Sequence, residues 1–237
     1  MGKRTRGIRK KLKQLYAAAA VAVLIVTFLL SAVLLAGKYC RDQSGKEEYR
    51  LLRKIAGISE NRQRYYMDSS HVPAVLDENG LLQINPDYAG WLFIPGTEIS
   101  YPVVYPENNY EYLNQTFEGK ENACGCLFFE ASYPPFSSEN TVIYGHNMKS
   151  GEMFGTLKKY REEDFFRQNK TIYLWHEGQW SMYQVQKAYL TDRKDKSPYE
   201  AGKEASEKMR LTLVTCHGKE QRLIVQAEKQ KNFLTPC

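Results

Sequence analysis

The stretch LTLVTCHGKEQRLIVQAEK, residues 211–229, places a cysteine at the end of one apolar run and an arginine at the start of the next. We interpret it as a β-hairpin whose loop is the five residues His217–Gln221. The two predicted strands are Leu211–Val214 and Leu223–Ala227. In this register Cys216 lies directly opposite Arg222, and cross-strand partners have Cβ atoms about 5 Å apart on one face. The stretch therefore predicts a thiol and a guanidinium side by side.

The polarity of the two faces of this hairpin supports the register. One face is apolar apart from Thr215, and it carries Leu211, Leu213, Leu223, Val225 and Ala227. The face of Cys216 is more mixed, and it carries Thr212, Val214, Ile224 and Gln226. Because side chains alternate across a strand, the apolar face is predicted to be the core. Cys216 and Arg222 are then expected to point outward from the sheet, onto a groove.

A cysteine in this position needs partners before it can react. A free thiol with a pKa near 8.5 is only a few per cent thiolate at neutral pH, so a nearby cation and a proton-transferring histidine are required. His217 follows Cys216 directly and points to the other face of an extended chain. His176 lies where a strand turns, and His71 precedes the β-rich region. His146 follows the strand TVIY through Gly145, where a strand end can present a side chain, but spacing alone does not bring it to Cys216.

The chain from about residue 80 has the texture of a mainly β domain. Short β-rich runs are separated by Pro-Gly, Asn-Pro and Glu-Gly turns, which is typical of an antiparallel barrel or sandwich. One helix is expected within it, because Met153, Phe154, Leu157 and Tyr160 have helical spacing and Phe165 and Phe166 follow.

The N-terminal region predicts a membrane anchor. Residues 17–37 form a stretch of 21 residues without a charge, long enough as a helix to cross a bilayer of roughly 30 Å. Seven basic residues precede it without an acid, so the N-terminus is expected in the cytoplasm and the rest of the chain outside. A cleaved signal peptide would have a shorter apolar region. A lipoprotein site is disfavoured because Lys38 and Tyr39 separate Gly37 from Cys40.

These observations predict four regions. They are a basic cytoplasmic tail (1–16), a transmembrane anchor (17–37), a stalk with an N-terminal helical region (38–79) and a barrel domain (80–237). The stalk covers Lys38–Lys46, and apolar residues at helical spacing predict a solvated helix from Glu47 to about Met67. The net charge of +6 resides in the tail, and no basic patch with interleaved aromatics indicates nucleic-acid binding.

Several motifs together resemble the class B sortases, a group of cysteine transpeptidases. The similar segments are INPDYAGWLFIPGTEISYPVV, NNYEYLNQTF, NTVIYGHNM, MFGTLKKYREEDFF and TLVTC with its downstream arginine, and they cover roughly residues 80–229. The resemblance implies a mainly β fold with peripheral helices, namely an eight-stranded barrel in which His146, Cys216 and Arg222 converge on a groove.

The resemblance also implies roles and partners. Cys216 would attack the carbonyl after a Thr in the C-terminal sorting signal of an exported protein, and an amine from a lipid-linked peptidoglycan precursor or a pilin would resolve the thioacyl enzyme. His146 would transfer protons, and Arg222 would hold substrate and stabilise the oxyanion. The implied substrate-binding residues are Asn109, Leu113 and Thr215. Two segments differ from the class B pattern: the short Cys-to-Arg loop and the short SPYEAGKEASEKMR.

Other readings remain open at this level. The chain could hydrolyse the thioester as an exported cysteine protease, or be an inactive scaffold on the same barrel. Cys124 and Cys126 are expected to be structural or free thiols on one face of a strand, and Cys40 and Cys237 could pair between molecules. Because no C-x-x-C or H-x-x-x-H spacing occurs, we expect no metal, and the resemblance implies no cofactor.

Overall fold

The computed structural model describes residues 2–58, 76–200 and 209–230. By compactness the chain divides into two units, 1–44 and 45–237. His71 and Cys237, which the sequence singled out, lie outside the described residues.

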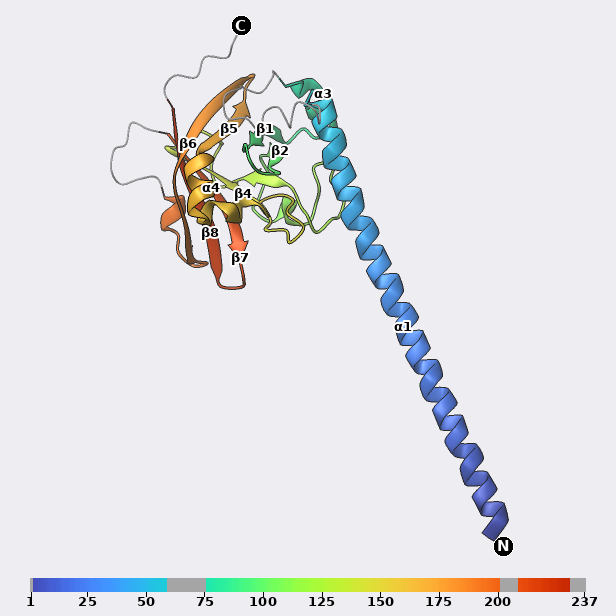
Figure 1. The fold of residues 1–237 in the computed structure, drawn as a ribbon. Helices are drawn as coiled ribbons and strands as arrows, with labels where there is room; N and C mark the ends of the chain where they lie inside the picture. Colours follow the sequence, from blue (N-terminus) through green and yellow to red (C-terminus); the bar gives the residue numbers. More distant parts are fainter. Residues whose placement is uncertain (1, 59–75, 201–208, 231–237) are drawn as a thin grey trace. The chain divides into compact units, whose positions relative to one another are not determined.

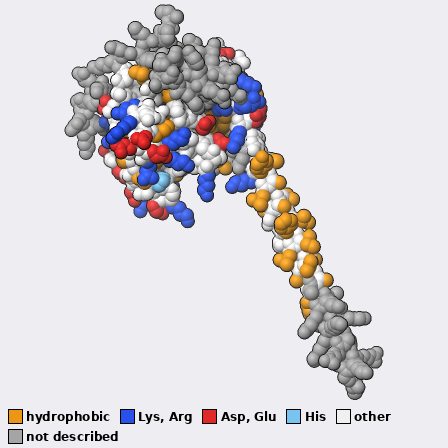
Figure 2. All heavy atoms as spheres, in the orientation of Figure 1, with side chains coloured by type: hydrophobic (Ala, Val, Ile, Leu, Met, Phe, Trp, Pro, Cys, Tyr) orange, Lys and Arg blue, Asp and Glu red, His pale blue; other side chains and the backbone are white. Residues whose placement is uncertain are grey.

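The N-terminal unit lies within a long helix, α1 (Gly2–Ile55). The side chains of residues 18–40 are exposed and largely apolar, and hydrophobic side chains line this part of the helix in Figure 2. The two hydroxyl groups in the segment bond back to the helix, since Thr27 Oγ1 donates to Leu24 O (2.9 Å) and Ser31 Oγ donates to Thr27 O (2.8 Å). An apolar helix with its polar groups satisfied internally suits a lipid environment. The segment is therefore a candidate membrane span.

The expected stalk at residues 38–46 is helical, because α1 continues through it without a break. A single glycine, Gly45, costs a helix only about 1 kcal/mol relative to alanine. The helix ends at Ile55, within the region where a second helix to about Met67 was expected, and residues after 58 are not described.

The second unit is a closed barrel of eight strands within the described residues (Figure 1). Its strands are β1 (Tyr88–Phe93), β2 (Ser100–Val104), β3 (Leu127–Phe129), β4 (Asn140–Tyr144), β5 (Thr171–His176), β6 (Gln179–Asp192), β7 (Arg210–His217) and β8 (Gln221–Lys229). Around the barrel the order is β1-β2-β3-β4-β7-β8-β6-β5. This confirms the mainly β barrel of eight strands, but two neighbouring pairs, β2–β3 and β4–β7, are parallel where the strand pattern predicts antiparallel pairing.

Two neighbour relations in this barrel matter for the site. β7 and β8 form an antiparallel hairpin, and β4 lies parallel to β7 on its other side. Because parallel neighbours run in the same direction, β4 and β7 end at the same edge of the sheet. The residues that follow β4 are thereby brought next to the end of β7.

Short helices occupy the connections. They are α3 (Glu78–Ile84), η1 (Glu111–Leu113), η2 (Leu157–Arg161), α4 (Glu163–Gln168) and η3 (Ser197–Tyr199). The single helix expected around residues 153–166 is instead the 3₁₀ helix η2 followed by α4. Met153 adopts a positive φ of 50°, which no right-handed helix accommodates, so the helix starts only after it. Met153, Phe154, Leu157 and Tyr160 are nevertheless buried in the core, as their spacing suggested.

The end of α1 belongs to the barrel unit and packs on its core. Tyr49 and Leu52, three residues apart on one face of α1, are buried, and so is Ala56 in the turn that follows the helix. Tyr49 meets Tyr101 of β2 edge to face, with ring centroids 5.3 Å apart. The last turns of the long helix are thus fixed to the barrel.

Candidate active site

The β7–β8 hairpin confirms the predicted register. Cys216 pairs with Arg222, and the ladder continues without a bulge from Arg210↔Glu228 to His217↔Gln221. The connecting turn is therefore the three residues 218–220 and not the predicted five, because His217 and Gln221 extend the ladder. Cys216 is exposed and Arg222 is half-buried, so the thiol is accessible at the sheet edge.

The two faces of the hairpin also follow the prediction. The apolar face lies in the main core, with Leu211, Leu213, Leu223, Val225 and Ala227 all fully buried. On the face of Cys216, Val214 and Ile224 form a second small cluster with Val142. Three tyrosines, Tyr144, Tyr189 and Tyr199, pack against that cluster. The middle of this outer face is therefore buried, with aromatic side chains packed against it, whereas Cys216 at its end is exposed.

His146 lies at the same sheet edge as Cys216. Tyr144 at the end of β4 pairs with Val214 of β7, which puts His146 level with Cys216 two residues later. Three hydrogen bonds fix this alignment: Gly145 N donates to Val214 O (3.2 Å), Thr215 Oγ1 to Gly145 O (2.7 Å) and Asn147 Nδ2 to Cys216 O (2.9 Å). The parallel pairing of β4 with β7 supplies the proximity that sequence spacing could not.

The ring of His146 is held from the side of η1. Its Nε2 lies 2.6 Å from Leu113 O. A carbonyl oxygen only accepts, so Nε2 carries the hydrogen in this contact. In the neutral ring Nδ1 is then the nitrogen with a free lone pair, available to take a proton. Which nitrogen is a base is thus set by one backbone carbonyl.

Gly125 makes this arrangement sterically possible. Its φ is +60°, and a Cβ added there would lie 2.7 Å from Leu113 O and 3.1 Å from His146 Cδ2. Any side chain at this position would push against the imidazole and against its hydrogen-bond partner. Residue 125 in the CGC segment must therefore be glycine because of the position of His146, and not because of the two neighbouring cysteines.

Arg222 is oriented by Tyr199 of η3. Arg222 Nη1 donates to Tyr199 Oη (2.5 Å), and the guanidinium carbon lies 5.6 Å from the ring centroid. Partial burial by itself lowers the pKa of Arg222, but the hydrogen bond to Tyr199 and the nearby Tyr199, Tyr144 and Cys216 outweigh it, so the pKa is raised. The guanidinium of Arg222 is therefore an oriented positive charge on the strand opposite the Cys216 thiol.

The three predicted substrate-binding residues have defined partners in the fold. Leu113 contributes the carbonyl that contacts His146. The Thr215 hydroxyl is bonded to Gly145 O, as described above. Asn109 Oδ1 accepts from Ala131 N (2.9 Å), and its Nδ2 donates to Glu130. Substrate binding by these residues stays a prediction.

Three residues near the site escaped the sequence analysis. Tyr144 Oη donates to Glu130 Oε2 (2.7 Å), and the ring of Tyr144 lies 6.1 Å from that of Tyr199. Burial raises the pKa of Glu130, but hydrogen bonds from Asn109, Tyr144 and Ser132 outweigh it and leave the pKa lowered. Tyr144 lies two residues before His146, and this spacing could have indicated that the two side chains lie on the same side of the sheet. Tyr199 and Glu130 carried no such signal.

Three further cysteines and His176 lie within the described residues. Cys124 and Cys126 are buried in the connection before β3 and not on a strand as expected, and burial raises the pKa of the Cys126 thiol. Cys40 is an exposed free thiol. His176 Nδ1 bonds to Ala89 O (2.9 Å), and its ring stacks on Phe136. Among the described residues, no group of three or more His, Cys, Asp or Glu side chains could hold a metal.

Comparison with known proteins identifies the family and the fold. A Sortase domain model matches residues 92–230. The chain is 30% identical over 176 residues to Sortase B of Listeria monocytogenes, covering 62% of this chain and 72% of that one. The crystal structure of Clostridium perfringens Sortase B is similar with a TM-score of 0.61 and 28% identity, covering 65% of this chain and 100% of that one.

A Streptococcus pyogenes class B sortase involved in pilus biogenesis is similar as well. Its TM-score is 0.58 at 27% identity, and the match covers 64% of this chain and 97% of that one. The closed barrel of this chain matches the fold of these solved structures. The chain belongs to the sortase family of cysteine transpeptidases, and within that family it is a class B sortase.

Proposed function

We propose that this sortase is anchored in the membrane by α1 and transfers exported proteins from a C-terminal sorting signal to an amine of the cell-wall precursor. The observation that carries the proposal is the convergence at one sheet edge of an exposed Cys216, a charged Arg222 opposite it and His146 with Nδ1 free to accept a proton. These are the nucleophile, oxyanion partner and acid–base group that acyl transfer needs. The catalytic domain would lie outside the cell.

In the first half-reaction, Cys216 would form a bond from Sγ to the carbonyl carbon of the Thr in the signal, and the bond from that carbon to the nitrogen of the next residue would break. The Cys216 proton would pass to His146 Nδ1, and His146 would return it to the nitrogen of the breaking peptide bond. Arg222 would stabilise the negative charge on the carbonyl oxygen. The released tail leaves a thioacyl enzyme.

In the second half-reaction, an amine would attack the thioester. His146 would take the proton from that amine as the new C–N bond forms, and the C–S bond would break to regenerate Cys216. Water competing for the same thioester would make the chain a protease. The amine must therefore reach the site faster than water does.

A direct test uses the full chain in detergent with a peptide that carries a Thr-containing sorting signal. We expect product formation that depends on added amine and is abolished in both Cys216→Ala and His146→Ala. Hydrolysis at a rate indifferent to amine would instead assign a protease, and wild-type transfer by either variant would remove the assigned residue from the mechanism. An inactive scaffold would form no thioacyl adduct at Cys216.

Pilus polymerisation is a second candidate, favoured by the similarity to the pilus-associated sortase of Streptococcus pyogenes. The two tasks use one chemistry and differ in the amine. Offering the thioacyl enzyme a peptidoglycan cross-bridge amine and a lysine side chain of a pilin-like peptide in competition separates them. The amine that is used faster shows whether the enzyme anchors proteins to the wall or polymerises pili. Cleavage of a peptide library then defines the sorting motif that an enzyme with this short β7–β8 turn accepts.

A further inference from the structure

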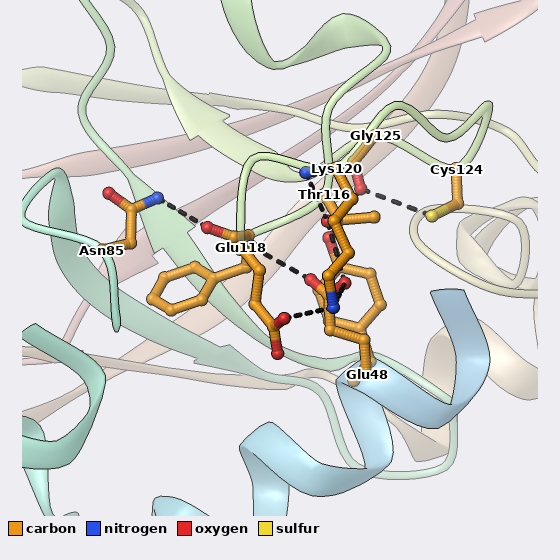
Figure 3. A network of polar contacts seen from close by, with 9 residues as sticks. Glu48, Asn85, Thr116, Glu118, Lys120, Cys124 and Gly125 are labelled. Atoms are coloured by element: carbon orange, nitrogen blue, oxygen red, sulfur yellow. Dashed lines mark hydrogen bonds and ion pairs between the residues drawn. The ribbon is translucent and has the colours of Figure 1, made fainter. Parts of the chain in front are cut away.

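The last turns of α1 contact the segment that supports His146. Figure 3 shows Glu48 on this helix pointing toward Thr116 and Lys120, beside the turn that carries Gly125. We call residues 112–126 the support segment, because it contains both Leu113 and Gly125, the two residues against which the imidazole rests. None of the helix residues involved touches the thiol or the guanidinium.

Glu48 is a nearly buried carboxylate, with 4% of its surface exposed. Its Oε2 accepts from Thr116 Oγ1 (2.9 Å), and its Oε1 accepts from Glu118 N (3.0 Å). Lys120 Nζ lies 3.7 Å from the same carboxylate. A buried charge is costly unless it is paired and hydrogen-bonded, and here each partner belongs to the support segment. The carboxylate therefore holds the tip of that segment against the helix.

Tyr49, the next residue, holds the other end of the support segment. Its Oη donates to Gly125 O (2.6 Å), and only 3% of the residue is exposed. Burial, with Cys126 and Cys124 nearby, raises the pKa of Tyr49 well above its usual value, so the hydroxyl remains a donor. The helix can approach this closely because residue 45 is glycine: a Cβ there would lie 2.9 Å from Asn122 Nδ2.

Backbone hydrogen bonds within the support segment connect its two ends, so a displacement of one end moves the other. Cys126 N donates to Tyr112 O (3.1 Å), Asn122 N to Asn114 O (2.9 Å) and Thr116 N to Lys120 O (2.9 Å). These bonds join the first part of the segment, residues 112–116, to its last part, residues 120–126. Leu113 O and Gly125 are thereby neighbours, and the imidazole of His146 rests on both.

A second polar contact connects α1 to the part of the chain just after His146. Lys46 Nζ pairs with Glu152 Oε1 at 2.7 Å, and Phe154 N, two residues later, donates to His146 O (2.9 Å). The helix thus contacts the segments on both sides of the imidazole. If the helix served only to bury apolar surface of the barrel, polar contacts to both of these segments would not be required.

We infer that Glu48 and Tyr49 are positioning residues, which hold the support segment so that Leu113 O keeps the His146 hydrogen on Nε2 and leaves Nδ1 as the base. The inference rests on the proposed function, in which His146 transfers the proton. It assigns to the C-terminal end of α1 a part in the reaction, although Glu48 and Tyr49 are far from Cys216 along the chain. Neither residue is catalytic, since neither contacts the reacting groups.

The test compares Tyr49→Phe and Glu48→Gln with matched controls in the full chain in detergent. Tyr183→Phe removes a buried hydroxyl that has no partner among the described residues, and Glu47→Gln makes the same change at the adjacent, exposed glutamate. The decisive readout is the ¹⁵N chemical shifts of the His146 imidazole, which report the tautomer without substrate. Their signals are assigned by their absence in His146→Ala.

We expect both positioning variants to show a larger fraction of the Nδ1–H tautomer. Their kcat should fall by roughly 5- to 20-fold, a part of the ~10²- to 10⁴-fold that a well-placed acid–base group contributes. KM for the signal peptide should stay unchanged, and both controls should resemble the wild type. Tyr49→Phe keeps the packed ring, so it decides the matter if Glu48→Gln lowers the thermal stability.

The outcomes separate the two proposals. Wild-type tautomer and wild-type kcat in Tyr49→Phe would overturn the positioning role while leaving transfer by Cys216 and His146 intact. An active His146→Ala would overturn the proposed function instead, whatever the tautomer data show. A loss of kcat in Tyr49→Phe with an unchanged tautomer would also count against positioning, because it would place the defect elsewhere.

Discussion

Replacing Gly125 by alanine tests the steric basis of the site. Gly119, in the same segment, is the matched control: both glycines have positive φ, +60° and +78°, but a Cβ at Gly119 would meet nothing within 4 Å. Each alanine costs about 1–2 kcal/mol for its left-handed backbone. This backbone cost is common to both variants. The difference in stability between Gly125→Ala and Gly119→Ala therefore reports only the contacts of the new methyl group at residue 125.

The methyl group at residue 125 would lie 2.7 Å from two backbone oxygens, those of Tyr112 and Leu113, and 3.1 Å from His146 Cδ2. Backbone atoms cannot rotate away, so the support segment or the imidazole must shift. Overpacking of this kind costs about 1–3 kcal/mol. For a domain of this size that is a melting temperature lower by about 2–12 °C than that of Gly119→Ala.

The assay measures the melting temperature by near-UV circular dichroism and transfer of a signal peptide to an amine, with the full chain in detergent. We expect Gly119→Ala to transfer like the wild type and Gly125→Ala to lose about 100-fold, since a misplacement of about 1 Å can cost that much. Equal stability and equal activity of the two variants would refute the reasoning. A stability loss without an activity loss would show that His146 does not depend on this contact.

Two further predictions concern the polar residues behind the site. Tyr199→Phe keeps the ring contact with Arg222 and should lower kcat/KM by roughly 10- to 150-fold in steady-state transfer, because a hydrogen bond to a charged group contributes about 1.5–3 kcal/mol; an unchanged value would mean that Arg222 needs no such orientation. Glu130→Gln should change how stability depends on pH. The lowered pKa of Glu130 means that its ionised form stabilises the fold above the ordinary value of 4.5 and that this contribution is lost as the pH falls through the folded-state pKa. Melting temperatures measured from neutral to acidic pH should therefore converge between wild type and variant, and a constant gap would contradict the assignment.

Much of the barrel could be predicted because its signals are local. Alternation of apolar and polar residues set the β7–β8 register and placed Cys216 opposite Arg222, and the ladder agrees residue by residue. The chargeless stretch before residue 38 likewise indicated a membrane span. The predicted helix around residue 157 failed because Met153 takes a positive φ, which helical spacing alone does not reveal.

The site as a whole could not be read from spacing. His146 and Cys216 are 70 positions apart in sequence, and only the parallel pairing of β4 with β7 aligns them. The resemblance to sortases named His146 in advance, but not the Leu113 carbonyl that selects its tautomer. Tyr199 lies in a connection whose sequence shows no periodicity, so its contact with Arg222 had no local signature.

The sequence by itself thus determined the strands, the hairpin register, the candidate anchor and, through its resemblance, the family. Those properties depend on neighbours along the chain, where alternation, length and charge act directly. Only the tertiary structure decided which nitrogen of His146 is free, what orients Arg222 and how Glu48 and Tyr49 meet the support segment. Each of these is a contact between residues at least 23 positions apart in sequence, and no local pattern encodes the distance between them.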